Sequence, residues 1–201
     1  MTSSQNEAHP PAARKLSSTR RWQLTGGALL IAVVVVLIDQ GTKVWAEATL
    51  TERERIPLIG DLLGLQLAYN PGAAFSFGED FTSVFALLAV AATVTAIVFA
   101  FRVQRRGWAI VVGALGGAAA SHAGDRLFRD PGFARGHVVD FLAYGNWFIG
   151  NIADIVIFTA AIAGALLAIR NDTERKNVLQ VREISTDPVR LVSDLTKVVG
   201  W

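Results

Sequence analysis

The chain has 201 residues, of which 52% are hydrophobic and 18% charged, and it carries a formal net charge of +2 at pH 7. Its mean hydropathy of +0.39 leaves too few polar residues to cover a soluble domain of this size, so the composition indicates a membrane protein. The sequence pI of about 9.3 comes from basic residues that flank the apolar segments, which argues against a nucleic-acid partner. The absence of cysteine excludes disulfides, thiolate metal sites and lipidation of the chain, and three scattered histidines do not suggest a metal centre.

Both ends of the chain are polar. Residues 1–21 are small, polar and proline-containing, and they predict a disordered cytosolic tail. Residues 171–201 are polar with scattered apolar positions, and they predict a cytosolic C-terminal tail that is either disordered or an amphipathic helix on the inner leaflet. Between these tails, residues 22–170 form the predicted membrane domain.

The membrane domain contains four apolar segments, each about as long as a helix that crosses a bilayer. They are residues 24–46, 81–101, 107–124 and 152–169. The alternative, four buried helices of a soluble protein, would need a large polar shell that the chain lacks. A cleaved signal peptide is the alternative for the first segment, but Asp39 and Lys43 stand where a small-residue cleavage site would be expected, so we expect a retained anchor.

The basic residues predict the orientation of these segments. They lie before the first segment, between the second and the third, and after the fourth. By the positive-inside rule both termini are cytosolic, and loops 47–80 and 126–150 face outward. The first outer loop has alternating and apolar pieces, which predict short strands or an interfacial segment. The predicted fold is an all-α membrane protein, a four-transmembrane-helix bundle with a small extracytoplasmic β or loop segment.

Three aspartates in or directly next to these segments lie at a similar predicted depth. At about 1.5 Å per residue, Asp39, Asp125 and Asp154 lie roughly 27, 28 and 24 Å from the nearest cytosolic arginine, in a hydrocarbon core about 30 Å thick. Asp39 and Lys43 are four residues apart and can pair on one helix face. Ionisable residues inside a membrane usually face the interior of a bundle and are candidates for function.

Asp125 and Asp154 suggest one chemistry if their helices bring them together. Two adjacent carboxyls share a proton and titrate as a unit. One then takes a proton from water while the other protonates the substrate carbonyl, as in aspartic proteases. In the alternative interpretation each aspartate only ends a span, where it is capped and solvated, and the residues alone leave both interpretations open.

Five ordered motifs carry a resemblance to a known family. They are "DQGTK" (39–43), "NPGAAFSF" (70–77), "GDRLFR" (124–129), "GHVVDF" (136–141) and "NIAD" (151–154). In order and spacing they resemble the bacterial lipoprotein signal peptidases (signal peptidase II), and the run around "DRLFR" resembles actinobacterial members. The resemblance covers about residues 22–170.

The resemblance implies a four-span aspartyl protease of the bacterial cytoplasmic membrane that removes the signal peptides of diacylglyceryl-modified prolipoproteins. Its active site would lie near the outer face of the membrane. The implied partners are lipid-modified prolipoproteins and membrane phospholipids. We expect a monomer that needs neither a metal nor another cofactor.

The resemblance also transfers roles to individual residues. It implies that Asp125 and Asp154 are the catalytic pair, from the DR and NxAD motifs. The supporting positions, for substrate binding or for the aspartate pair, are Asp39, Lys43, Asn70, His122, Arg126, Asn151 and Ala153. Ala153 would leave room for the substrate. Asp140, in "VVDF", is interpreted as a structural residue of the outer loop.

The sequence departs from the family beside the first of these aspartates. Ser121 and His122 stand where the family usually has glycine and asparagine. Histidine titrates near neutrality, so His122 could place a cation beside the pair. This departure motivates an alternative hypothesis, a catalytically weak paralogue that binds lipoprotein precursors without cleaving them.

Overall fold

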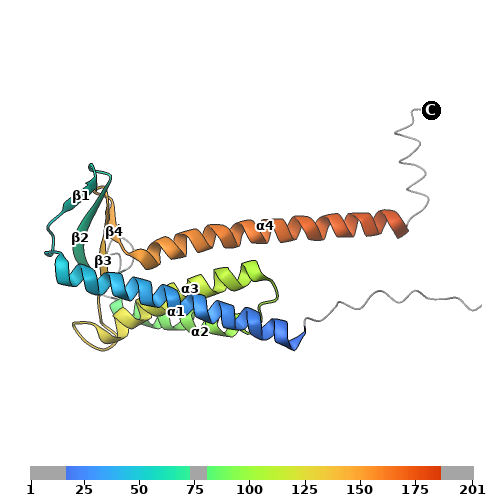
Figure 1. Cartoon of the computed structure of the whole chain (residues 1–201), viewed down its shortest axis with the longest axis horizontal. Helices are drawn as coiled ribbons and strands as arrows, with labels where there is room; N and C mark the ends of the chain where they lie inside the picture. The colour runs from blue at the N-terminus through green and yellow to red at the C-terminus, as the bar shows by residue number, and fades with distance from the viewer. Residues whose placement is uncertain (1–16, 73–80, 187–201) are drawn as a thin grey trace, which may run out of the picture.

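The computed structural model describes residues 17–72 and 81–186, which form four long helices and one four-stranded sheet (Figure 1). In chain order these elements are α1 (Ser18–Thr49), β1 (Ile56–Ile59), β2 (Leu63–Asn70), α2 (Thr82–Ala100), α3 (Arg106–Phe128), β3 (Val138–Tyr144), β4 (Phe148–Gly150) and α4 (Ile152–Thr186). The sheet lies across one end of the helices, and α4 extends beyond the other three at the opposite end.

Three of the described helices are long and apolar enough to cross a membrane: α1, α2 and the Ile152–Leu179 part of α4. Their outer surfaces expose large apolar side chains such as Leu30, Leu87 and Phe158, which suits contact with lipid. The predicted spans are confirmed for these three helices. The fourth helix, α3, also forms, but its apolar run is diluted by glycines and by the polar end that carries Asp125, so its crossing stays a prediction.

Helix α3 lies at the centre of the bundle, in contact with α1, α2 and α4. A Cβ added at Gly113 would lie 2.4 Å from the carbonyl oxygen of Ala28, and one at Gly117 would lie 2.5 Å from that of Ala32. Only glycine permits this approach of α1 to α3, which is how small residues act at helix interfaces in membranes. The close packing brings the polar end of α3 against both α1 and α4.

The sheet is antiparallel with the strand order β1-β2-β3-β4. Val139 and Phe141 of β3 pack in a buried cluster with Ala46 and Leu50 from the end of α1. Because side chains alternate along a strand, Asp140 lies on the opposite face of β3 from these two residues. The strand therefore attaches the sheet to α1 with one face and presents Asp140 with the other.

The helices extend beyond the predicted membrane domain at both ends. Helix α1 begins at Ser18, where the Ser17 side chain accepts a hydrogen bond from the Arg20 amide, so residues 18–21 are not part of a disordered tail. Helix α4 continues to Thr186 instead of ending near residue 170. The predictions for residues 1–16 and 187–201, and for residues 73–77 of the "NPGAAFSF" motif, lie outside the described residues.

Candidate active site

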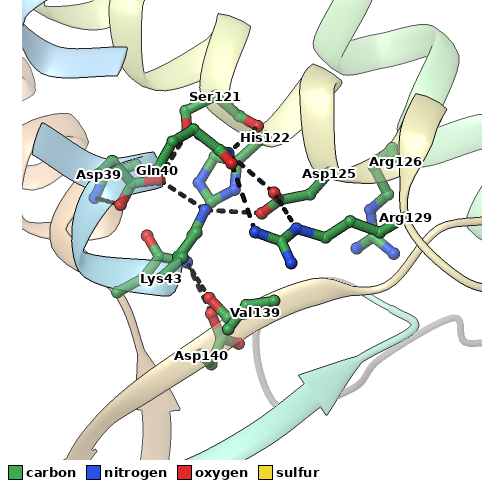
Figure 2. A network of polar contacts seen from close by, with 12 residues as sticks. Asp39, Gln40, Lys43, Ser121, His122, Asp125, Arg126, Arg129, Val139 and Asp140 are labelled. Carbon is green, nitrogen blue, oxygen red and sulfur yellow. Dashed lines mark hydrogen bonds and ion pairs between the residues drawn. The ribbon is translucent and has the colours of Figure 1, made fainter. Parts of the chain in front are cut away.

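Lys43 is the centre of a buried ion cluster at the sheet end of the helices (Figure 2). Its Nζ lies 2.6 Å from Oδ2 of Asp39 and 2.7 Å from Oδ2 of Asp125, and all three side chains are fully buried. We call Asp39, Lys43 and Asp125 the Lys43 cluster. Buried charges are tolerated when every partner is in place, so this cluster depends on all three residues. Burial also rules out a Lys43 side chain that reaches the membrane interface.

Asp125 has partners on both carboxylate oxygens. While Oδ2 contacts Lys43, Oδ1 accepts hydrogen bonds from Gln40 Nε2 at 2.8 Å and from Arg129 Nε at 2.7 Å. Arg129 also forms an ion pair with Glu47 of α1, with 2.6 Å between Nη1 and Oε1. Figure 2 shows Lys43, Gln40 and Arg129 gathered around the Asp125 carboxylate. Asp125 is thus held in a structural network between α3 and α1.

Asp39 connects the cluster to the start of α4. Its Oδ2 accepts a hydrogen bond of 2.6 Å from the Ser121 hydroxyl, and its Oδ1 accepts one of 2.8 Å from the backbone amide of Ala153. The first amides of a helix have no partner within the helix, so Asp39 caps α4 from a neighbouring helix. The Lys43 cluster therefore fixes the position of the turn that carries Asp154.

The "NIAD" motif forms the local cap of α4. The Asn151 side-chain oxygen accepts from the Asp154 amide at 3.1 Å, and Asp154 Oδ2 accepts from the Asn151 amide at 2.9 Å. This reciprocal pair is a capping box with an aspartate in its second position. The other oxygen of Asp154, Oδ1, lies 3.4 Å from Nε2 of His122. One oxygen of Asp154 is thus held by backbone, while the other lies beside a histidine.

Asp140 of β3 is buried next to this cap. Its Oδ1 accepts a hydrogen bond of 2.6 Å from the Asn151 side-chain amide, and its Oδ2 accepts one of 3.0 Å from that of Asn70. Burial raises the pKa of Asp140 to about 6, and the negative charge of Asp154 also raises it. The hydrogen bonds from Asn70 and Asn151 and the charge of His122 lower this pKa by less. Asn151 therefore bonds to both Asp140 and Asp154, and Asp140 can exchange a proton near neutral pH.

A cavity of about 340 Å³ contains both of these carboxyls. Its walls are otherwise mostly apolar, apart from His122, Asn70 and Arg126. The lining residues are Asn70, Gly72, Phe85, Ala89, His122, Arg126, Val138, Asp140, Phe148, Ile149 and Asp154. A small cavity with a few convergent polar groups is the usual form of a ligand site. Asp125 does not line it.

Arg126 shapes the wall of the cavity through the backbone. Its guanidinium donates to four carbonyl oxygens and lies 5.8 Å from the ring centroid of Phe85. The acceptors are the carbonyls of Asn70, Pro71, Gly72 and Gly136. Arg126 therefore holds the end of β2 and the start of β3 against α3. Among the described residues its hydrogen bonds go to these carbonyls and not to an acid.

The structure divides the predicted site residues into two groups. The Lys43 cluster and the buried Asn151 and Ala153 lie outside the cavity lining. The lining contains the other four predicted residues, His122, Arg126, Asn70 and Asp154. Of the predicted catalytic pair, Asp154 lines the cavity, whereas both oxygens of Asp125 contact Lys43, Gln40 and Arg129 outside it. Ala153, predicted to leave room for the substrate, does not line the cavity either.

Asp140, interpreted from the sequence as a structural residue of the outer loop, lines the cavity. Its neighbours in "VVDF" are apolar, and an aspartate in an apolar strand is costly to bury unless it has hydrogen-bond partners. Together with the strand alternation, which puts Asp140 on the same face as Val138, this signal was present in the sequence. The partners Gln40 and Arg129 of the ion cluster were also not predicted.

Comparison with known proteins gives a consistent set of relatives. Residues 31–170 match the family model of signal peptidase (SPase) II. The lipoprotein signal peptidase of Bifidobacterium adolescentis is 41% identical, over 68% of this chain and 73% of that protein. The lipoprotein signal peptidase of Leifsonia xyli is 39% identical, over 77% of this chain and 74% of the relative. The lipoprotein signal peptidase of Mycolicibacterium smegmatis is 36% identical, over 84% of this chain and 67% of the relative.

Solved structures share the fold. A bacterial membrane enzyme determined by the in meso method at 2.3 Å superimposes with a TM-score of 0.64 and 26% identity, covering 75% of this chain and 92% of that one. A second bacterial membrane enzyme structure, determined at 1.9 Å, superimposes with a TM-score of 0.61 and 23% identity, covering 71% of this chain and 92% of that one. This second match shows a likeness of fold alone.

Proposed function

The chain belongs to the signal peptidase II family, whose members are proteases that remove signal peptides from prolipoproteins, and we propose that it does so with Asp140 and Asp154 as its two catalytic carboxyls. The observation that carries this proposal is the shared cavity in which Asn151 bonds to both residues. Asp140 takes the place that the sequence motif suggested for Asp125.

The two carboxyls have environments that suit opposite roles. Asp140 is buried and its pKa is raised to about 6, which favours its protonated form. Asp154 accepts a backbone hydrogen bond and lies beside His122, and both contacts favour its ionised form. Two carboxyls whose environments favour opposite protonation states can serve as a general acid and a general base.

The reaction follows from these roles. Asp154 takes a proton from a water molecule whose oxygen attacks the scissile carbonyl carbon, while Asp140 gives its proton to the carbonyl oxygen. When the tetrahedral intermediate collapses, the C–N bond breaks and the amine leaves with the proton held by Asp154. The intermediate's hydroxyl proton returns to Asp140, which restores the starting state.

The Lys43 cluster has a positioning role in this scheme. It holds the first turn of α4 through the bond from the Ala153 amide to Asp39, and Asp154 is the next residue. Asp125 completes the cluster by neutralising Lys43 together with Asp39. We therefore assign Asp125 to the support of the site.

The membrane arrangement is part of the same proposal. Helix α3 is the fourth span, since it is 23 residues long and packs between α1 and α2. The positive-inside rule supports cytosolic termini and a sheet at the outer face of the bacterial inner membrane. There the cavity can admit the lipid-modified region of a prolipoprotein from the bilayer, with phospholipids around a monomer. The described residues show no feature that favours a non-cleaving homologue.

A processing assay with three matched variants tests the pair. Asp140→Asn, Asp154→Asn and Asp125→Asn each remove one charge, and cleavage of a diacylglyceryl-modified precursor is followed by gel shift. We expect the first two to lose about 10²- to 10⁴-fold in rate. Asp125→Asn should lower the folded fraction but keep measurable cleavage per folded molecule. Full activity of Asp140→Asn together with complete loss in folded Asp125→Asn would restore the pair of Asp125 and Asp154.

A further inference from the structure

His122 is the cavity residue that neither the capping box nor the two-carboxyl mechanism uses. We propose that it is a positioning residue for Asp154: it donates from Nε2 to Oδ1 of that carboxylate and, when protonated, keeps it ionised at acidic pH. This inference rests on the proposed function, because it assigns Asp154 the role of the base. It concerns a residue at which the chain departs from the asparagine usual in the family it resembles.

The geometry leaves one oxygen of Asp154 for this contact. Its Oδ2 is held by the Asn151 amide at 2.9 Å, so Oδ1 is the oxygen that faces His122, at 3.4 Å from Nε2. Catalytic hydrogen bonds are often long without substrate and shorten in the substrate complex. The His122 side chain is 18% exposed, so it reaches the cavity without being solvated like a surface residue.

The charges around His122 come from each element packed near it. Asp154 of α4 and Asp140 of β3 lie in the same cavity, and Phe85 and Ala89 of α2 are neutral. The other charged groups close to His122 on its own helix and on α1 have partners of their own. They are Asp125 with Lys43 and Arg129, Asp39 with Lys43, and Arg126 with backbone carbonyls. A proton on His122 therefore faces the Asp154 carboxylate directly, and Asp140 and Arg126 are the other ionisable groups of the cavity.

This placement predicts a specific pH effect. A cation beside Asp154 makes protonation of that carboxylate harder, so the base stays active to lower pH. A neutral residue at position 122 removes this effect and lets Asp154 take up its proton at higher pH. The acid limb of the kcat/KM profile should then move upward by roughly one pH unit. A residue that only fills space would leave that limb where it is.

His122→Gln separates the charge from the hydrogen bond, because its amide nitrogen donates from about the position of Nε2 without titrating. We expect cleavage of lipid-modified precursor at pH 8 within a few-fold of wild type, with the acid limb of kcat/KM shifted upward. His122→Ala should show the same shift and a lower kcat as well. Unchanged acid limbs in both variants would overturn the inference. Retained cleavage by Asp140→Asn and Asp154→Asn would instead overturn the proposed function.

A second measurement does not depend on turnover. In a variant with His9→Gln and His137→Gln, the remaining histidine signal in the NMR spectrum belongs to His122. Adding Asp154→Asn replaces the carboxylate that lies beside Nε2, so the ring signals of His122 should change their chemical shifts. Should a position-122 variant fail to fold, this measurement decides alone, and unchanged ring signals would contradict the contact.

Discussion

Asn151 and Asp140 are joined by a hydrogen bond of 2.6 Å from the Asn151 side-chain amide to Oδ1 of the aspartate. The bond links β3 to the residue that directly precedes α4, beside the packing of Ile152 against the cluster of Val139 and Phe141. Because the Asn151 side-chain oxygen accepts from the Asp154 amide, its NH₂ group is left to face Asp140. A residue that caps a helix thereby also fixes the orientation of an acid on the sheet.

Replacing Asn151 can separate these two roles. Serine is as good an N-cap as asparagine but is too short to reach Asp140. Asn151→Ser should therefore keep the helix cap but leave Asp140 Oδ1 without its amide donor, which costs about 1–3 kcal/mol of unfolding free energy and lowers kcat for precursor cleavage. Asn151→Ala loses the cap as well and should cost about 1 kcal/mol of unfolding free energy in addition. Equal activity of the serine variant and wild type would show that the bond to Asp140 has no catalytic importance.

Lys43 should matter for stability more than any exposed lysine. Lys43→Met leaves Asp39 and Asp125 buried without their shared cation, and we expect a loss of about 3–5 kcal/mol in unfolding free energy in detergent. Lys176→Met is the matched control, because this lysine pairs with Asp172 four residues away but is 75% exposed. The control should unfold like wild type. Similar stability of both variants would contradict the structural role of the Lys43 cluster.

Much of the fold could be predicted from local patterns. Long apolar runs predict the spans because a bilayer requires them, and the glycines of α3 predict close packing because their missing side chains admit another backbone. The pairing of Asp39 with Lys43 follows from their spacing on one helix. Each of these features depends on residues that are near one another in sequence.

The composition of the site could not be predicted in this way. A depth estimate places Asp125 and Asp154 at one level, but it does not say toward which neighbour each side chain turns. Asp125 turns toward Lys43, while His122, one turn earlier on the same helix, faces the cavity. Asp140 enters the site through strand register, which pairs Val138 with Asn70 and so brings the Asn70 amide to Asp140. This cross-strand bond depends on the register of the sheet, so the sequence around Asp140 indicates its burial but not its partner Asn70.

The raised pKa of Asp140 predicts how its replacement changes stability with pH. The native state holds this proton up to about pH 6, whereas the unfolded chain releases it near the ordinary aspartate pKa of 3.8. Between these values the native state binds more protons, so the contribution of Asp140 to stability falls as pH rises. It amounts to a loss of up to about 3 kcal/mol between pH 4 and pH 7.

Asp140→Asn removes this titration, so its stability relative to wild type should rise by up to about 3 kcal/mol between pH 4 and pH 7. The variant also places an NH₂ group against one of the two amides that donate to Asp140, which adds a penalty that does not depend on pH. Unfolding in denaturant at the two pH values separates the effects, because only their difference reports the titration. A difference between variant and wild type that stays constant across this range would show that Asp140 is already ionised in the folded protein well below pH 6.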